Sequence, residues 1–241
     1  MSIVKEAVEY NIPHLPVVVL MSAVAWAAVF ALSIAASRKV SLYPSGAQNV
    51  VEMIFEKIFA LADSAIGEEA YRYYPLFLGL AFFIFVSNIL GAIPGLISPT
   101  SNPNVCIGLA VTVFVYYNFQ GIRKYGFGYL KHFYIPGLPL WLIPVNVLVF
   151  FIELISNFVR PFSLAIRLFC NIFSKEALLS FLAFLVASFV SSGGIEKYIA
   201  VMPFLLRPAV VLLAFLLGLV QTLIFLILSI VYIAGAVKSE H

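Results

Sequence analysis

The sequence has little charge, and that scarcity limits what kind of protein it can be. Only 10% of its 241 residues are Asp, Glu, Lys or Arg, and 63% are hydrophobic, whereas about a quarter of the residues of a soluble domain are charged. A water-soluble fold could not bury so much apolar surface, so the chain must be surrounded by lipid. The net charge of +3 includes no basic run of the kind that binds nucleic acid. The sequence therefore predicts an all-α integral membrane protein.

Cysteine and histidine are also scarce. The two cysteines lie inside apolar segments and the three histidines are far apart, which leaves no disulfide framework and no paired metal ligands. We therefore expect no metal and no cofactor. A GxxxxGK[ST] loop is absent, which argues against a P-loop nucleotide site. No nucleophile with a base and no acidic metal cluster can be recognised, so an intramembrane enzyme is not favoured.

Long apolar runs indicate the membrane segments of a single domain, 1–241. They predict a first span at 15–36, a helical pair at 75–97 and 105–122, and two long helices at 138–190 and 199–237. The first run could be a cleaved signal, but the segment before it lacks a basic start, which favours a retained span. The charge-free stretch 208–237 would be about 45 Å long as a helix, against a hydrocarbon core of about 30 Å. We therefore expect the last two helices to form an oblique hairpin.

Segment 47–66 has a different pattern. Its polar residues fall within one stripe of a 3.6-residue helix, and apolar residues fill much of the remainder. The polar residues are Gln48, Asn49, Glu52, Glu56 and Asp63. This pattern predicts an amphipathic helix that lies in the membrane interface or on a partner.

The basic residues predict the orientation of the chain. With these spans, Lys5 and Lys197 fall on one side of the membrane and eight Lys or Arg residues fall on the other. The excess places the C-terminus and segment 47–66 in the cytoplasm. The eight are Arg38, Lys39, Lys57, Arg72, Arg123, Lys124, Lys131 and Lys238.

The stretch RPFSLAIRLFCNIFSKE, residues 160–176, concentrates charge inside a predicted span. An ionised side chain at the bilayer centre costs roughly 2.5–3.5 kcal/mol on insertion scales. Arg160 and Lys175, near the ends of the stretch, can extend toward the interface. Arg167 is central, has no acid three or four residues away, and cannot lose its proton. A counter-charge on another chain explains it better than a structural pair does.

Several polar residues share one narrow face with Arg167. On a regular helix at 100° per residue they lie within about 40° of it, although Pro161 weakens the match for those that precede it. They are Glu153, Arg160, Ser163, Asn171 and Ser174, whereas Glu176 lies about 180° away. On the last helix, Gln221 shares a side with Gly218 and Thr222, and we expect it to pair with this polar face. From the residues alone, Glu153 with Arg160 could be a purely structural pair, and Gln221 could be a helix-to-helix contact.

The segment SLAIRLFCNIFSKE resembles the signature SLGLRLFGNMxAGE of the a subunit of F-type ATP synthases. The segments PTSNPNV, IPVNVLVFFIELIS and QTLIFLILSIVYIAGAVKSEH fit the same family, in order, as does the helix after Pro44. The resemblance implies a membrane-sector stator subunit that is not an enzyme on its own. It implies two proton half-channels that reach a ring of c subunits, each with a membrane carboxylate, and peripheral-stalk b subunits as further partners. The general character of the chain favours a bacterial cytoplasmic (inner) membrane.

The resemblance also assigns roles to residues. Arg167 matches the essential arginine of the family and Glu176 its channel acid, while Asn171, Gln221 and Glu153 match positions of the polar path. Ser163 and Ser174 are added to the proton path from helix geometry alone.

The sequence departs from the family pattern at three places. Cys170 replaces the usual glycine, and Lys175 stands where a small residue is usual. Ala214 and Gly218 occupy the region where some members have a histidine. No titratable group therefore stands on the last helix where those members have the histidine.

Two other kinds of protein remain as alternatives. A self-contained channel or transporter would show inverted-repeat halves with paired broken helices, and none is recognisable in this sequence. A structural membrane subunit of a respiratory complex is the other alternative.

Overall fold

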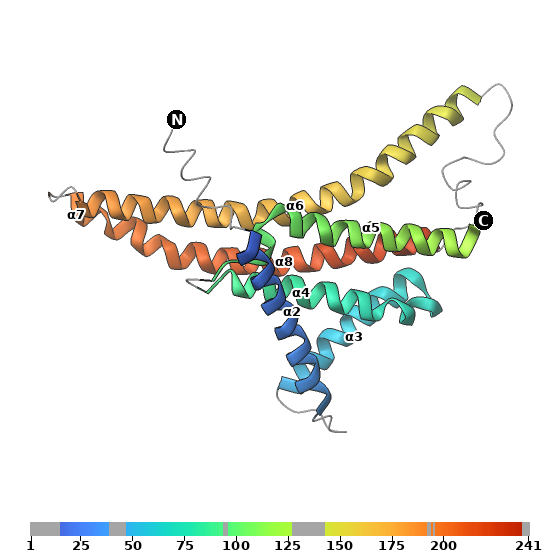
Figure 1. Ribbon diagram of the computed structural model, residues 1–241, viewed down its shortest axis with the longest axis horizontal. Helices are drawn as coiled ribbons and strands as arrows, with labels where there is room; N and C mark the ends of the chain where they lie inside the picture. Colours follow the sequence, from blue (N-terminus) through green and yellow to red (C-terminus); the bar gives the residue numbers. More distant parts are fainter. Residues whose placement is uncertain are drawn as a thin grey trace. The chain divides into compact units, whose positions relative to one another are not determined.

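The computed structural model describes residues 15–38, 47–93, 96–126, 143–191, 194 and 196–237. Within these residues every regular element is a helix (Figure 1), so the predicted all-α class is confirmed. The beginning of the expected 138–190 helix lies outside the described residues. So do Lys5, Lys39, Lys131 and Lys238, four of the residues on which the predicted orientation depends.

Four of the helices are long and apolar enough to cross a membrane, and α4 is a shorter apolar helix. The four are α2 (Leu15–Arg38), α5 (Pro103–Tyr125), α6 (Ile143–Ser191) and α8 (Val201–Val237). The remaining elements are α3 (Ala47–Ile66), η1 (Glu68–Arg72), α4 (Tyr74–Leu90), η2 (Pro99–Ser101) and α7 (Glu196–Ile199). The chain is thus an integral membrane protein by the length and composition of its helices.

The two longest helices exceed the thickness of a bilayer. α6 has 49 residues and α8 has 37, which correspond to about 74 Å and about 56 Å. Pro161 lies inside α6 and Pro208 inside α8, and both helices continue beyond these prolines. Because the hydrocarbon core is about 30 Å thick, helices of this length must tilt or extend past it.

Local sequence explains several helix ends. Gly67 separates α3 from η1 with φ = 90°, a conformation that glycine adopts without steric cost. α5 begins at Pro103, where a missing N–H costs no helical hydrogen bond. Arg123 and Lys124 lie in its last turn, where cations interact favourably with the helix dipole.

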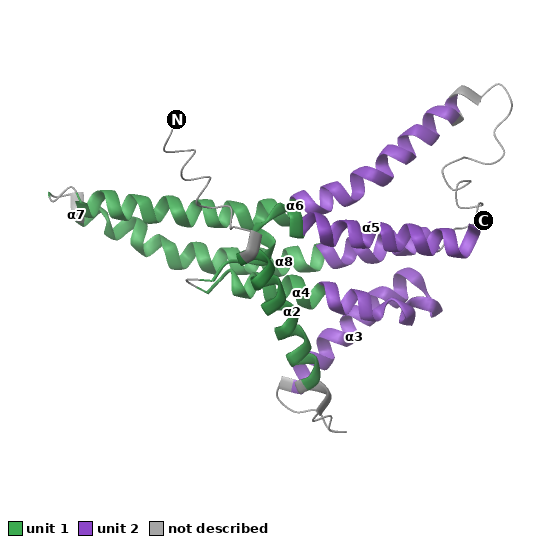
Figure 2. Ribbon diagram, in the orientation of Figure 1, with its two compact units in different colours: residues 1–38, 81–105, 167–224 green, residues 39–80, 106–166, 225–241 purple. Residues whose placement is uncertain are grey.

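The described residues form two compact units, which Figure 2 colours separately. Unit 1 comprises residues 1–38, 81–105 and 167–224, and unit 2 comprises residues 39–80, 106–166 and 225–241. In unit 1, α2 contacts the second half of α4, where the Trp26 ring stacks on Phe83 with ring centroids 4.9 Å apart.

Unit 2 is held together largely by aromatic side chains. Phe59 of α3 stacks on Tyr74 of α4 at 4.0 Å between ring centroids, and the Tyr74 hydroxyl donates to Asp63. Phe114 of α5 contacts Phe158 of α6 at 5.6 Å between centroids. These contacts place α5 and the first half of α6 in register, which positions the polar residues described below.

Candidate functional site

Arg167 lies on an exposed face of α6 in unit 1. Cys170 and Ser174, one and two turns further along, are also exposed, whereas Leu168 and Ile172 on the other side of the helix are buried. No residue in the described ranges forms an ion pair or a hydrogen bond with the Arg167 guanidinium. α6 therefore presents a permanent positive charge outward, without a counter-charge in the described part of the chain.

Lys175 is buried in unit 1. It is only 8% exposed, and its ammonium donates a hydrogen bond to the carbonyl oxygen of Gly91 at 2.8 Å. Its charge therefore points into unit 1, and Lys175 does not use the extension toward the interface that its place near the end of the stretch allows. The reason is a backbone carbonyl beyond the end of α4, which offers the ammonium an acceptor inside the protein.

Gly91 makes room for that ammonium. A Cβ atom at position 91 would lie 2.8 Å from the Lys175 Nζ and 2.8 Å from the Ser98 Cβ. A side-chain Cβ atom essentially never lies this close to an atom to which it is not bonded, so only glycine fits here without a shift of its neighbours. Asn171 and Glu176, on the same helix as Lys175, are each partly exposed.

A buried polar cluster joins α4 to α8 in unit 1. We call it the Asn88 cluster, and it consists of Ser87, Asn88, Gly218, Gln221 and Thr222. The Asn88 Nδ2 donates to the Gly218 carbonyl oxygen at 2.9 Å and to the Thr222 Oγ1 at 3.2 Å. A Cβ at position 218 would lie 3.1 Å from the Asn88 Cγ, so the amide fills the space that glycine leaves.

Three polar atoms of the Asn88 cluster have no hydrogen-bond partner among the described residues. They are the Ser87 Oγ, the Asn88 Oδ1 and the Gln221 Nε2, all in buried side chains. An unpaired buried polar atom costs about 1–3 kcal/mol, and such atoms are the ones that bind ordered water. Among the described residues, no hydrogen bond joins Gln221 to the polar face of α6, where the sequence predicts its partner. Asn88 of α4, rather than α6, supplies the polar contact to this part of α8.

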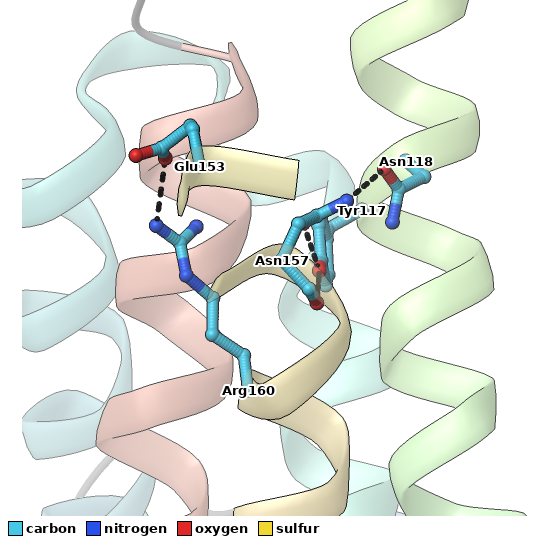
Figure 3. A network of polar contacts seen from close by, with 5 residues as sticks. All are labelled: Tyr117, Asn118, Glu153, Asn157 and Arg160. Atoms are coloured by element: carbon cyan, nitrogen blue, oxygen red, sulfur yellow. Dashed lines mark hydrogen bonds and ion pairs between the residues drawn. The ribbon is translucent and has the colours of Figure 1, made fainter. Parts of the chain in front are cut away.

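Unit 2 holds the other predicted path residues, Glu153 and Ser163. Ser163 is exposed, and Glu153 is partly exposed with its Oε1 3.2 Å from the Arg160 Nη2 (Figure 3). Glu153 and Arg160 therefore form an ion pair, which the sequence analysis gave as one possibility. A long arginine can make this contact two turns away because helical side chains lean toward the N-terminus.

Arg160 stands beside a second group of polar contacts. The Tyr117 hydroxyl of α5 donates to the Asn157 Oδ1, and the Asn157 Nδ2 donates to the Asn118 Oδ1 at 3.3 Å (Figure 3). The Asn157 side chain is buried, with an exposed fraction of 7% for the residue. These contacts anchor the turn of α6 that leads into Arg160.

The structure thus groups the predicted site residues into two sets. Unit 1 holds Arg167, Asn171, Ser174, Glu176 and Gln221, and unit 2 holds Glu153 and Ser163.

The sequence analysis did not identify Ser87, Asn88 and Asn157 as members of these polar groups. In the sequence they are amides and a hydroxyl that only interrupt apolar runs. An asparagine inside an otherwise apolar span could have indicated a buried polar contact there. Over the described ranges no three His, Cys, Asp or Glu side chains gather as a metal site.

Comparison with known proteins gives a consistent result. The family model described as "ATP synthase A chain" matches residues 18–234. A protein of Sulfurihydrogenibium sp. (strain YO3AOP1) named ATP synthase subunit a is 41% identical over 206 residues, which cover 85% of this chain and 89% of that protein. Proteins of the same name are 39% identical in Helicobacter pylori (strain Shi470), covering 88% of this chain and 86% of that protein, and 35% identical in Geobacter sulfurreducens, covering 87% and 82%.

Proposed function

This chain belongs to the ATP synthase A chain family, and we propose that it is the stator subunit that conducts protons through the membrane sector of a rotary ATP synthase. In this role it is not an enzyme by itself and needs no cofactor. It couples transmembrane proton flow to rotation, and the ATP chemistry takes place on other chains of the complex.

One observation of the structure carries the proposal. Arg167 is a permanent cation on an exposed face of an apolar helix, without an ion-pair partner in the described part of the chain. A charge of this kind facing lipid would cost several kcal/mol. A carboxylate on a neighbouring chain removes that cost, and the c subunits implied by the family resemblance provide one each.

The charge of Arg167 explains how it would act. A fixed cation stabilises the ionised form of an approaching carboxylate, so a c subunit that arrives at Arg167 releases its proton. The same cation repels protons and blocks a direct leak between the two half-channels. Proton entry and exit therefore have to use the ring, and net flow turns it.

The remaining site residues receive proposed places along the path. Glu176 is the channel acid, and Asn171, Gln221 and Ser174 supply hydrogen-bonding groups in unit 1. Glu153 and Ser163 belong to the path in unit 2. The Asn88 cluster extends the polar set around Gln221, where its unpaired atoms can hold water.

We further propose the surroundings of the chain. Its partners are the ring of c subunits, the peripheral-stalk b subunits and the lipid bilayer. The membrane is the bacterial cytoplasmic (inner) membrane, and the C-terminus lies in the cytoplasm with α3 on the same side.

Replacement of Glu176 by glutamine tests the proposal. Because the amide cannot carry a proton, ATP-driven proton pumping should fall by about ten-fold or more, in line with the loss of a positioned proton-transfer group. Glu176→Asp, which keeps the carboxyl group, should retain most of the activity. Pumping is measured with a pH-sensitive dye in membrane vesicles, per amount of assembled complex.

The outcome separates this function from a structural one. A Glu176→Gln complex that assembles and pumps at the normal rate would contradict a proton path through this residue. A loss of assembly in both variants would favour a structural membrane subunit.

A further inference from the structure

Among the described residues, Glu153 and Arg160 form the one ion pair between two side chains of the same membrane helix, and its surroundings are specific. The side chains are 36% and 37% exposed, respectively, and their charged atoms are 3.2 Å apart. On an isolated chain that exposure would be to water, but in a membrane helix it is to lipid or a partner. If either side chain is removed, the charge of the other therefore has no ion-pair partner inside the membrane.

The guanidinium of Arg160 has a second partner on another helix. Its Cζ lies 5.6 Å from the centroid of the Tyr232 ring of α8, within the range of a cation–π contact. The Tyr232 ring in turn contacts Tyr117 of α5, with centroids 6.1 Å apart. Arg160 is therefore held from two sides, by a carboxylate on its own helix and by an aromatic ring on α8.

The hydrogen bonds drawn in Figure 3 hold this arrangement in place. Tyr117 both contacts the Tyr232 ring and donates to Asn157, which lies one turn before Arg160 on α6. Asn157 also donates to Asn118. Three helices of unit 2 thus fix the guanidinium where it meets the Glu153 carboxylate.

We propose that Arg160 is a positioning residue for the proton path, and that Glu153 serves the path as its fixed counter-charge rather than as a group that carries a proton at each step. Arginine keeps its charge under all working conditions, so protonation of Glu153 would leave Arg160 with only the Tyr232 ring as a partner. Glu153 therefore stays ionised and paired, and the pair orients the local electric field along the path without taking up a proton. This inference rests on the proposed function.

A double-variant cycle tests the proposal. We expect Glu153→Gln and Arg160→Gln each to slow ATP-driven proton pumping about ten-fold or more, because each leaves one charge unpaired. The variant with both changes has a neutral pair in the same place. It should pump at least about three-fold faster than either single variant.

The pumping rates of four further variants distinguish this role from simple packing. Arg160→Lys keeps the charge and should restore most of the pumping rate. Tyr232→Phe keeps the ring face and should be neutral, whereas Tyr232→Leu should slow pumping. Arg207→Gln, which removes an exposed arginine of α8 without an ion-pair partner in the described ranges, is the matched control and should pump normally.

Each other outcome overturns the inference. If the double variant is as slow as Glu153→Gln, then Glu153 is itself a proton carrier. If the losses of the two single variants multiply in the double variant, the residues do not act through each other. Arg167→Ala is measured in the same vesicles: normal pumping there would reject the proposed function itself, whereas loss of pumping there with an additive cycle rejects only this inference.

Discussion

Replacement of Arg167 by alanine is expected to abolish both ATP-driven proton pumping and proton-driven ATP synthesis while the complex still assembles. A guanidinium about 4 Å from a carboxylate contributes about 4 kcal/mol at an effective dielectric constant of 20. Since each 1.36 kcal/mol corresponds to a tenfold change in rate, the loss should reach at least about a hundred-fold. The exposed position of Arg167 means that its removal leaves no cavity in the core of unit 1.

One further measurement on the Arg167→Ala complex and one control variant make this result specific. Passive proton leak through vesicles should rise, because the charge that separates the half-channels is gone. Arg207→Ala also removes one positive charge, but from α8, and should leave pumping and leak unchanged. Undiminished pumping by the Arg167→Ala complex would contradict a charge acting on the ring, and failed assembly would indicate that Arg167 mainly holds helices or subunits together.

Replacement of Gly91 by alanine is expected to destabilise the protein and to slow proton transport. The new Cβ would lie 2.8 Å from both the Lys175 Nζ and the Ser98 Cβ, so the ammonium loses its hydrogen bond to the Gly91 carbonyl or the chain around Ser98 shifts. Forcing extra atoms into packed structure costs typically about 1–3 kcal/mol. Thermal unfolding of the purified complex in detergent measures the first effect, and dye-based pumping measures the second.

Gly79→Ala is the control glycine substitution, inside α4, whereas Gly91 directly follows the last residue of that helix. Apart from its chain neighbours and the backbone of its own helix, no atom of the described residues lies within 4 Å of a Cβ built at Gly79. This change should therefore be neutral or slightly stabilising, because alanine favours helix over glycine. Adding Lys175→Ala to Gly91→Ala should recover part of the stability, since it removes one of the two overlaps. Equal thermal stability of Gly91→Ala and Gly79→Ala would show that the Gly91 contact with Lys175 is not formed.

The sequence alone was sufficient for the all-α membrane class, because lipid leaves only helices for a chain with such long apolar runs. It was also sufficient for the family, because several motifs fit in order along the chain. The expected ranges 47–66 and 105–122 correspond to α3 (Ala47–Ile66) and α5 (Pro103–Tyr125). Patterns of this kind depend on residues close together in the sequence, which is why they can be read without a structure.

Contacts between distant segments could not be predicted in the same way. The sequence places Lys175 beside Glu176 but does not indicate that a carbonyl 84 residues away accepts its hydrogen bond. Asn88 looked like a mere interruption of an apolar run, because its partners Gly218 and Thr222 lie on the last helix. The rotation of each helix about its axis decides such contacts, and hydrophobic periodicity does not fix it when a helix is apolar on all sides.

The central claim, that the Arg167 face of α6 meets the carboxylates of the c ring, can be tested with a thiol that the chain already has. Cys170 is exposed one turn from Arg167, whereas Cys106 is buried. In membranes whose c subunits carry a cysteine one turn from the carboxylate, mild oxidation should join this chain to a c subunit, and Cys170→Ser should abolish the product. If Cys170 reacts with a lipid-soluble maleimide but never forms a disulfide with a c subunit, Arg167 does not face the ring.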